Sequence, residues 1–267
     1  MSPPECACDA EQTTEDAFLG GSLSVRQPRR GYRAGIDAVL LAATVLAKGQ
    51  RAPRVLDLGA GVGTVGLAVA RRIADARVVL LEREPSLCRL ARGNVERNDL
   101  VTRVDIVEAD VTASAQALAG HGVGAEGFDV ALANPPYHDA ARGTPSGNLM
   151  RARAHAMAEG ELEAWLRVMA RVVRPGGRAT LVHKSEALGE LLAALDGRFG
   201  GIKVLPIHPR ADEGAHRVLV TGIKGSRAPL VLLPGLVLHA QGSNALMPAA
   251  EAIVRHGEGL DLDATMC

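Results

Sequence analysis

The sequence predicts an α/β fold with a mostly parallel sheet and helices on both faces. Short apolar segments alternate with segments of helical pattern about ten residues long, an order typical of βαβ units. The apolar segments are continuous rather than alternating, as expected for strands buried on both faces. Hydrophobic residues make up 47% of the 267 residues and charged residues 22%, so the chain can form a core and is not a disordered sequence.

Each element follows from a local signal. Pro85 suits the first turn of a helix. Pro175-Gly176-Gly177 ends the helix that is expected at 162–173. Only the loop 207–216 separates the last two strands, which predicts that the final strand is antiparallel. Runs of Val, Leu, Ile and Ala predict strands at 54–58, 77–81, 103–107, 128–133, 178–183, 202–206 and 217–223. Helices are expected at 37–48, 64–73, 85–98, 114–119, 162–173 and 186–196.

The chain is expected to contain one main domain. Residues 1–20 are polar and are expected to form a mobile N-terminal tail, residues 21–240 the domain, and residues 241–267 a C-terminal extension. The acidic N-terminus has no signal-peptide pattern, and no apolar run of about 18 residues predicts a membrane span, so we expect a cytoplasmic protein. The four cysteines show no metal-ligand spacing, so no metal site is expected.

Charge and aromatic content limit how the chain could bind nucleic acid. The 30 basic residues balance the 30 acidic ones, and aromatics are 2% of the chain, which excludes a broad stacking surface. Local arginines could still form a basic rim that contacts phosphates, or could be solvated or paired with nearby acids. They are Arg26, Arg29, Arg30 and Arg33 before the first helix, and Arg142, Arg151 and Arg153 farther along the chain.

A glycine-rich segment follows the first predicted strand and opens a helix. Asp57-Leu58-Gly59-Ala60-Gly61-Val62-Gly63 places glycines where a backbone can pass close to a ligand, and Glu82 ends the next strand, where a carboxylate can accept ribose hydroxyls. Gly61 to Gly66 also matches GxGxxG, so NAD is an alternative cofactor. Asp57 weighs against NAD, because a carboxylate there would repel a pyrophosphate. The same carboxylate can hold the ammonium end of S-adenosylmethionine.

Two further polar sites follow later strands. Asp110 closes the third strand and could accept a hydrogen bond from an adenine amino group. Asn134-Pro135-Pro136-Tyr137 follows the fourth strand, where the prolines force the chain out of the sheet. The Asn134 side-chain oxygen and the Pro135 carbonyl can accept the two hydrogens of a conjugated amine, and Tyr137 can stack on its planar group.

Together these motifs resemble the class I S-adenosylmethionine methyltransferases that act on planar amino groups. More narrowly, Gly31-Tyr32-Arg33-Ala34-Gly35-Ile36-Asp37 and Arg217-Val218-Leu219-Val220 are similar to segments of the tRNA1(Val) adenine-N6 methyltransferase family. The resemblance implies a Rossmann-like, seven-stranded, mostly parallel sheet with an antiparallel last strand. It implies catalysis by Asn134, Pro135 and Tyr137. It also implies cofactor binding by Tyr32, Asp37, Asp57, Gly59, Ala60, Gly61, Gly63, Glu82, Arg83, Asp110 and Asn134.

The resemblance therefore implies methyl transfer (EC 2.1.1.-) to the N6 amine of an adenine in RNA, with tRNA as the expected substrate. One alternative is a protein glutamine N5-methyltransferase of the release-factor type, although only about 30 residues precede Gly31, where such enzymes carry a helical domain. Alternatives of another class are an NAD-dependent oxidoreductase, for which the Asn-Pro-Pro-Tyr segment has no role, and a non-catalytic RNA-binding module.

Overall fold

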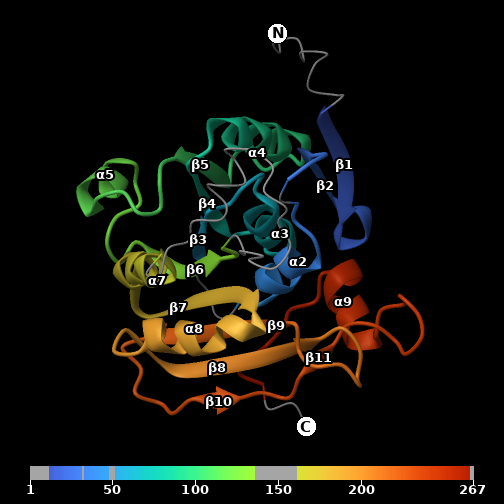
Figure 1. The fold of residues 1–267 in the computed structure, drawn as a ribbon. Helices are drawn as coiled ribbons and strands as arrows, with labels where there is room; N and C mark the ends of the chain where they lie inside the picture. The colour runs from blue at the N-terminus through green and yellow to red at the C-terminus, as the bar shows by residue number, and fades with distance from the viewer. Residues whose placement is uncertain (1–11, 32, 48–51, 136–160, 265–267) are drawn as a thin grey trace, which may run out of the picture.

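A single large sheet runs through the molecule. The computed structural model describes residues 12–31, 33–47, 52–135 and 161–264. Within them the strand order is β10-β8-β9-β7-β6-β3-β4-β5, with β5 and β10 at opposite ends (Figure 1). The long strands are β3 (Arg54–Leu58), β4 (Arg77–Glu82), β5 (Val104–Glu108), β6 (Phe128–Ala133), β7 (Val173–Lys184), β8 (Phe199–His208) and β9 (Arg217–Lys224).

The directions of the strands confirm the predicted fold class. Strands β3, β4, β5, β6 and β7 pair in parallel, whereas β9 pairs antiparallel with both β7 and β8. Two short strands that the sequence did not predict, β10 (Val231–Leu232) and β11 (Leu236–Val237), pair in parallel with β8. The seven long strands therefore form the expected mostly parallel sheet with an antiparallel last strand.

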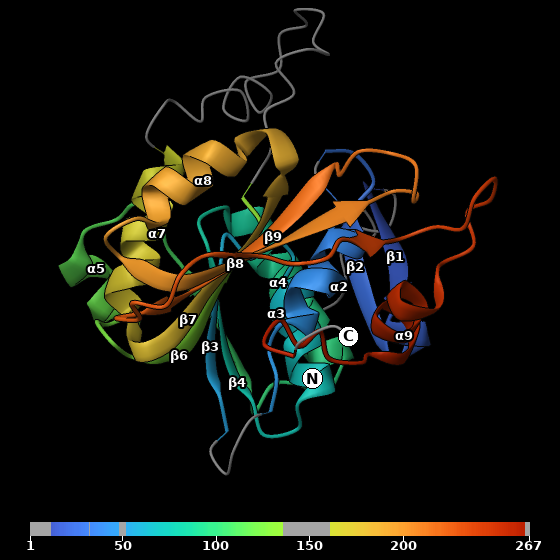
Figure 2. The same cartoon turned by 90° about the horizontal axis from the view of Figure 1, so that it is seen from below.

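Helices cover both faces of the sheet (Figure 2). Buried Leu40, Leu67 and Val95 belong to a core cluster on one face, and buried Leu118, Leu166 and Leu191 belong to a second cluster on the other. The first face carries α2 (Ile36–Ala43), α3 (Thr64–Arg72), α4 (Pro85–Arg97) and α9 (Pro248–His256); the second carries α5 (Ala115–Gly120), α7 (Glu161–Val172) and α8 (Leu188–Leu195). Helix α2 ends at Ala43, earlier than predicted.

An N-terminal hairpin corrects the predicted tail. β1 (Thr13–Phe18) pairs antiparallel with β2 (Leu23–Pro28) through the 3₁₀ turn η1 (Leu19–Gly21). Residues 13–18 are thus a strand of a two-stranded sheet, and residues 19 and 20 belong to its turn. The pattern failed to predict it because β1 is polar and its burial alternates only weakly.

The C-terminal segment packs on the same face as α2. Leu236, Leu238, Ile253 and Leu260 are all buried in the first core cluster. The Leu260 N–H also donates to the carbonyl oxygen of Ala43 at 2.8 Å, at the end of α2. This segment therefore completes one face of the core.

Among the described residues, no helix combines the length and apolar character that crossing a membrane requires.

Candidate active site

The loop between β3 and α3 turns on three glycines. Their φ angles are +63° at Gly59, +58° at Gly61 and +90° at Gly63, in the left-handed region that favours glycine. The Ala60 N–H donates to the carbonyl oxygen of Leu81 at 3.0 Å, which ties the loop to the end of β4. The glycine loop, residues 59–63, is therefore held at the carboxyl edge of the sheet, where ligands of such folds bind.

Glu82 is fixed under this loop by backbone donors. Its Oε2 accepts the Gly61 N–H at 2.8 Å, and its Oε1 accepts the N–H groups of Arg83 and Glu84, both at 2.9 Å. The side chain is buried. Each carboxylate oxygen has two acceptor sites, so Oε2 keeps capacity for one more donor.

Asp57 lies deeper, beneath the start of α3. Its residue is 1% exposed, and its Oδ2 accepts the Gly66 N–H at 2.9 Å. Burial raises the pKa of this carboxyl to about 7; the Gly66 hydrogen bond opposes the rise, and the charge of Glu82 adds to it. Asp57 is therefore shielded from solvent. It accepts a hydrogen bond from the first turn of α3, and it can influence a ligand at the glycine loop through its charge.

Asp110 and Arg83 form an ion pair beyond β5. Arg83 Nη1 lies 3.2 Å from Asp110 Oδ2, and the Thr112 N–H and hydroxyl both donate to Asp110 Oδ1 at 2.7 Å. Partial burial alone would raise the pKa of Asp110, but these hydrogen bonds lower it below its ordinary value. Asp110 is therefore an ionised acceptor near the end of β5.

Asn134 and Pro135 lie beside the glycine loop because of strand register. β3 and β6 are neighbouring parallel strands, and their last paired residues are Leu58 and Ala133. Gly59 and Asn134 therefore leave adjacent strands at the same level. Pro135 is buried and Asn134 is half-buried. Pro136 and Tyr137 lie outside the described residues.

Asp37 links two of the segments on which the family resemblance was based. It lies in the first turn of α2, and its Oδ2 is 3.1 Å from Nε of Arg217 at the start of β9. Both side chains are largely buried, so the ion pair joins α2 to the antiparallel strand. Tyr32 lies outside the described residues.

The residues present fit S-adenosylmethionine. Glu82 and Asp110 bring carboxylate acceptors to the ends of neighbouring strands, matching a ribose and an adenine amino group as donors, and the carboxyl of buried Asp57 on the next strand, when ionised, supplies a negative charge that favours an ammonium. Next to them, a Cβ placed on Gly61 would meet nothing within 4 Å, so a ligand can approach the loop backbone there. This order of acceptors along the sheet edge follows the order of donors in the cofactor.

The family model described as "Methyltransferase small domain" matches residues 35–206, well over half of the chain. The chain belongs to this family. It is therefore an S-adenosylmethionine-dependent methyltransferase, and the NAD-dependent alternative is set aside.

Curated relatives carry one shared name. A tRNA1(Val) (adenine(37)-N6)-methyltransferase from Aeromonas hydrophila is 29% identical over 209 residues, covering 76% of this chain and 81% of that protein. One from Glaesserella parasuis serovar 5 is 28% identical over 156 residues, 58% of this chain and 61% of its own length. The chain thus spans less than two thirds of the second relative.

Solved structures support the fold. A crystal structure described as a predicted O-methyltransferase, Atu636 from Agrobacterium tumefaciens, is 35% identical with a TM-score of 0.72, covering 85% of this chain and all of that one. A S-adenosylmethionine-dependent O-methyltransferase from Thermotoga maritima has a TM-score of 0.52 at 17% identity, covering 74% of this chain and 68% of that one. The second likeness shows the fold alone.

The predicted basic residues are only partly available. Arg33 forms an ion pair with Asp16 at 2.6 Å, and Arg29 Nε donates to the Thr13 carbonyl at 3.0 Å. Arg29 and Arg30 are exposed, and Arg26 is half-buried. The remaining three, Arg142, Arg151 and Arg153, lie outside the described residues.

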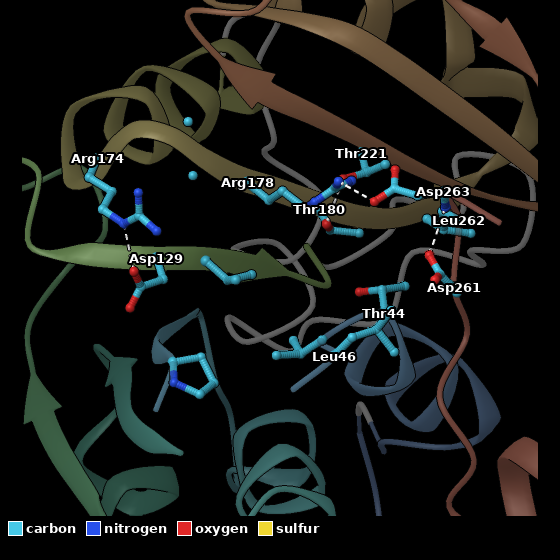
Figure 3. A pocket seen from close by; sticks show the side chains of 15 residues that line it. Thr44, Leu46, Asp129, Arg174, Arg178, Thr180, Thr221, Asp261, Leu262 and Asp263 are labelled. Carbon is cyan, nitrogen blue, oxygen red and sulfur yellow. Dashed lines mark hydrogen bonds and ion pairs between the residues drawn. The ribbon is translucent and has the colours of Figure 1, made fainter. Parts of the chain in front are cut away.

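A separate cavity lies at the opposite edge of the sheet. It has a volume of about 220 Å³ and is lined by Asp129, Arg178 and Asp263 among others (Figure 3). Arg178 pairs with Asp263 at 2.6 Å, and Arg174 pairs with Asp129 at the same distance. Because it opens at the amino ends of β6 and of the parallel part of β7, it is not part of the candidate active site.

Proposed function

We propose that the enzyme transfers a methyl group to the exocyclic N6 amine of an adenine in tRNA. The observation that carries the proposal is the placement of Asn134-Pro135 at the end of β6, at the level where Gly59 leaves β3. The names of the curated relatives support this acceptor. S-adenosylmethionine supplies an electrophilic methyl group when bound at the glycine loop.

The chain's own residues would do three things. Glu82 and Asp110 would hold the ribose and the adenine of the cofactor, and Asp57 would favour its positive end. The side-chain oxygen of Asn134 and the carbonyl of Pro135 would each accept a hydrogen of the acceptor amine. That pair of hydrogen bonds draws the nitrogen towards a tetrahedral shape and aims its lone pair, so that the rate gain comes from orientation and fixed dipoles.

Asn134→Ala tests the amine clamp. We expect methyl transfer to fall at least about 100-fold while S-adenosylmethionine still binds, because the acceptor amine loses one of its two partners whereas the other proposed cofactor contacts remain. The measurements are calorimetric binding and transfer of labelled methyl groups to total tRNA. The control is Asn244→Ala, at an exposed asparagine far along the chain. Undiminished transfer by Asn134→Ala would rule out the clamp.

The choice of acceptor is tested with the same labelled cofactor. Separate fractions of tRNA, DNA and protein are offered, and the labelled tRNA is digested to nucleosides for mass analysis. N6-methyladenosine supports the proposal. Label in protein would favour the glutamine alternative, and a methylated hydroxyl would favour the O-methyl transfer named for the Agrobacterium structure.

We propose that exposed Arg29 and Arg30 contact tRNA phosphates, together with Arg26, Arg33, Arg142, Arg151 and Arg153. The double variant Arg29→Ala/Arg30→Ala should weaken tRNA binding. The slope of the logarithm of the binding constant against the logarithm of salt concentration should become less steep, by the amount expected for about two lost phosphate contacts. Binding is measured between low and physiological salt. Arg227→Ala, at an exposed arginine after β9, is the matched control. Equal slopes in both variants would remove the two arginines from the interface.

A further inference from the structure

The single tryptophan of the chain lies against the glycine loop. Trp165 is on α7, half-buried at the edge of the second core cluster. A Cβ placed on Gly59 would be 3.1 Å from Cζ3 of the indole and closer still to Cη2. Real Cβ atoms do not come that close to a ring, so the six-membered ring of Trp165 packs directly on the Gly59 backbone.

Gly59 differs in this respect from its neighbour in the loop. Gly61 has a similar φ of +58°, but a Cβ there would meet nothing within 4 Å. The left-handed backbone explains a glycine at both positions, whereas the ring contact is an additional constraint at Gly59. One glycine thus faces open space and the other is held by a large aromatic side chain.

The helix that carries Trp165 also packs near the strand ends beside the proposed acceptor site. The chain leaves the sheet at Asn134-Pro135, and the next described element is α7, which begins at Glu161. Leu166 of α7 is buried in the same core cluster as Leu58 and Ala133, the last residues of β3 and β6. Trp165 is therefore anchored by the element that supports both strand ends of the site.

We propose that Trp165 is a positioning residue for the cofactor. Its ring holds Gly59, and with it the backbone groups of the glycine loop on which S-adenosylmethionine lies. A loop that is already ordered loses less conformational entropy when the ligand binds, so removing its support weakens binding. The inference rests on the glycine loop as the cofactor site and is independent of the acceptor.

The test measures cofactor binding and the emission of Trp165. Because the chain has one tryptophan, S-adenosylhomocysteine should change the intrinsic fluorescence of the wild-type protein saturably, with the Kd found by calorimetry. Trp165→Ala should raise that Kd about tenfold, and the Kd of Trp165→Phe should lie between those of the wild type and Trp165→Ala. With methyl transfer as readout, KM for the cofactor should rise while KM for the acceptor stays unchanged.

Met169→Ala is the control for mere loss of packing. Met169 is one turn farther along α7 and fully buried, so its truncation lowers stability without touching Gly59. Its Kd should match the wild type. The positioning role is overturned if Trp165→Ala leaves the Kd unchanged, or if Met169→Ala raises the Kd by as much as Trp165→Ala does. Either result overturns it regardless of any change in the fluorescence of the wild-type protein. A wild-type protein that binds no cofactor would instead refute the glycine loop as the site.

Discussion

Asp57 shows how the environment of one residue shapes the site. Its carboxyl is buried beneath α3, accepts one backbone N–H from Gly66 and lies near the charge of Glu82. Its pKa of about 7 in the folded protein is well above the ordinary value of 3.8. Folding therefore favours the protonated form, and keeping Asp57 ionised at neutral pH costs stability unless a positive group lies nearby.

The pH dependence of stability follows from this raised pKa. Below the pKa of Asp57 in the unfolded chain, the carboxyl is protonated in both states and the free energy of unfolding does not depend on its ionisation. As pH rises from about 4 to about 7, the carboxyl ionises in the unfolded state first, so the free energy of unfolding falls. Relative to Asp57→Asn, the cofactor-free wild type should lose up to about 4 kcal/mol over that range. Chemical denaturation of both proteins between pH 4.5 and 8 measures the difference. Parallel curves would contradict the raised pKa.

Helix α4 holds the N-terminal hairpin with two amide side chains. Asn94 accepts the Arg26 N–H at 2.8 Å and donates to the Arg26 carbonyl at 3.0 Å. One turn later, Asn98 does the same with Ser24, at 3.0 and 2.7 Å. Both asparagines are buried, and they pair with alternate residues of β2 as a neighbouring strand would.

Removing either amide should release the hairpin. Asn94→Ala and Asn98→Ala each leave an N–H and a C=O of a half-buried β2 residue without that partner, so each should cost about 1–3 kcal/mol. Hydrogen exchange should show lost protection in β2 and unchanged protection in β3 and β6. Arg92→Ala, at an exposed position of the same helix, is the control. Unchanged protection of β2 would mean that other contacts hold the hairpin.

These elements show what the sequence could and could not predict. The long parallel strands were predicted well because each is a continuous apolar run. The glycine loop after β3 and Glu82 at the end of β4 lie where the sequence placed them because their signals are local, and their role in cofactor binding stays a prediction. The hairpin was missed because β1 is polar, and the amides that hold its second strand to α4 are 68 to 74 residues away in the sequence. Trp165 gave no signal beyond a core aromatic, and the Arg217 contact with Asp37 spans 180 residues. Contacts that exist only in the folded chain have no local pattern.

At the scale of the whole molecule, Arg72 joins three distant segments. It ends α3, and its Nε donates to the Gly257 carbonyl at 2.8 Å, just past α9. Its Nη1 donates to the carbonyls of Ala42 and Val45, at 2.7 and 3.2 Å, where α2 ends. The last carbonyls of a helix lack a regular partner within it, so Arg72 adds donors to the carbonyls at and just past the end of α2. Burial lowers the pKa of this guanidinium below its ordinary value.

Arg72→Met should therefore loosen the C-terminal segment and lower the stability of the whole fold. Methionine keeps the apolar stem but removes three charged hydrogen bonds, two of them to carbonyls of buried residues, a loss of about 2–4 kcal/mol. Urea denaturation measures that loss, and limited proteolysis should find faster cleavage after Gly257. Arg71→Met is the matched control, since Arg71 is exposed and makes one such bond, to the Asn98 carbonyl. If the two variants unfold at the same urea concentration, Arg72 does not hold these segments together, and the buried leucines of the C-terminal segment must do so alone.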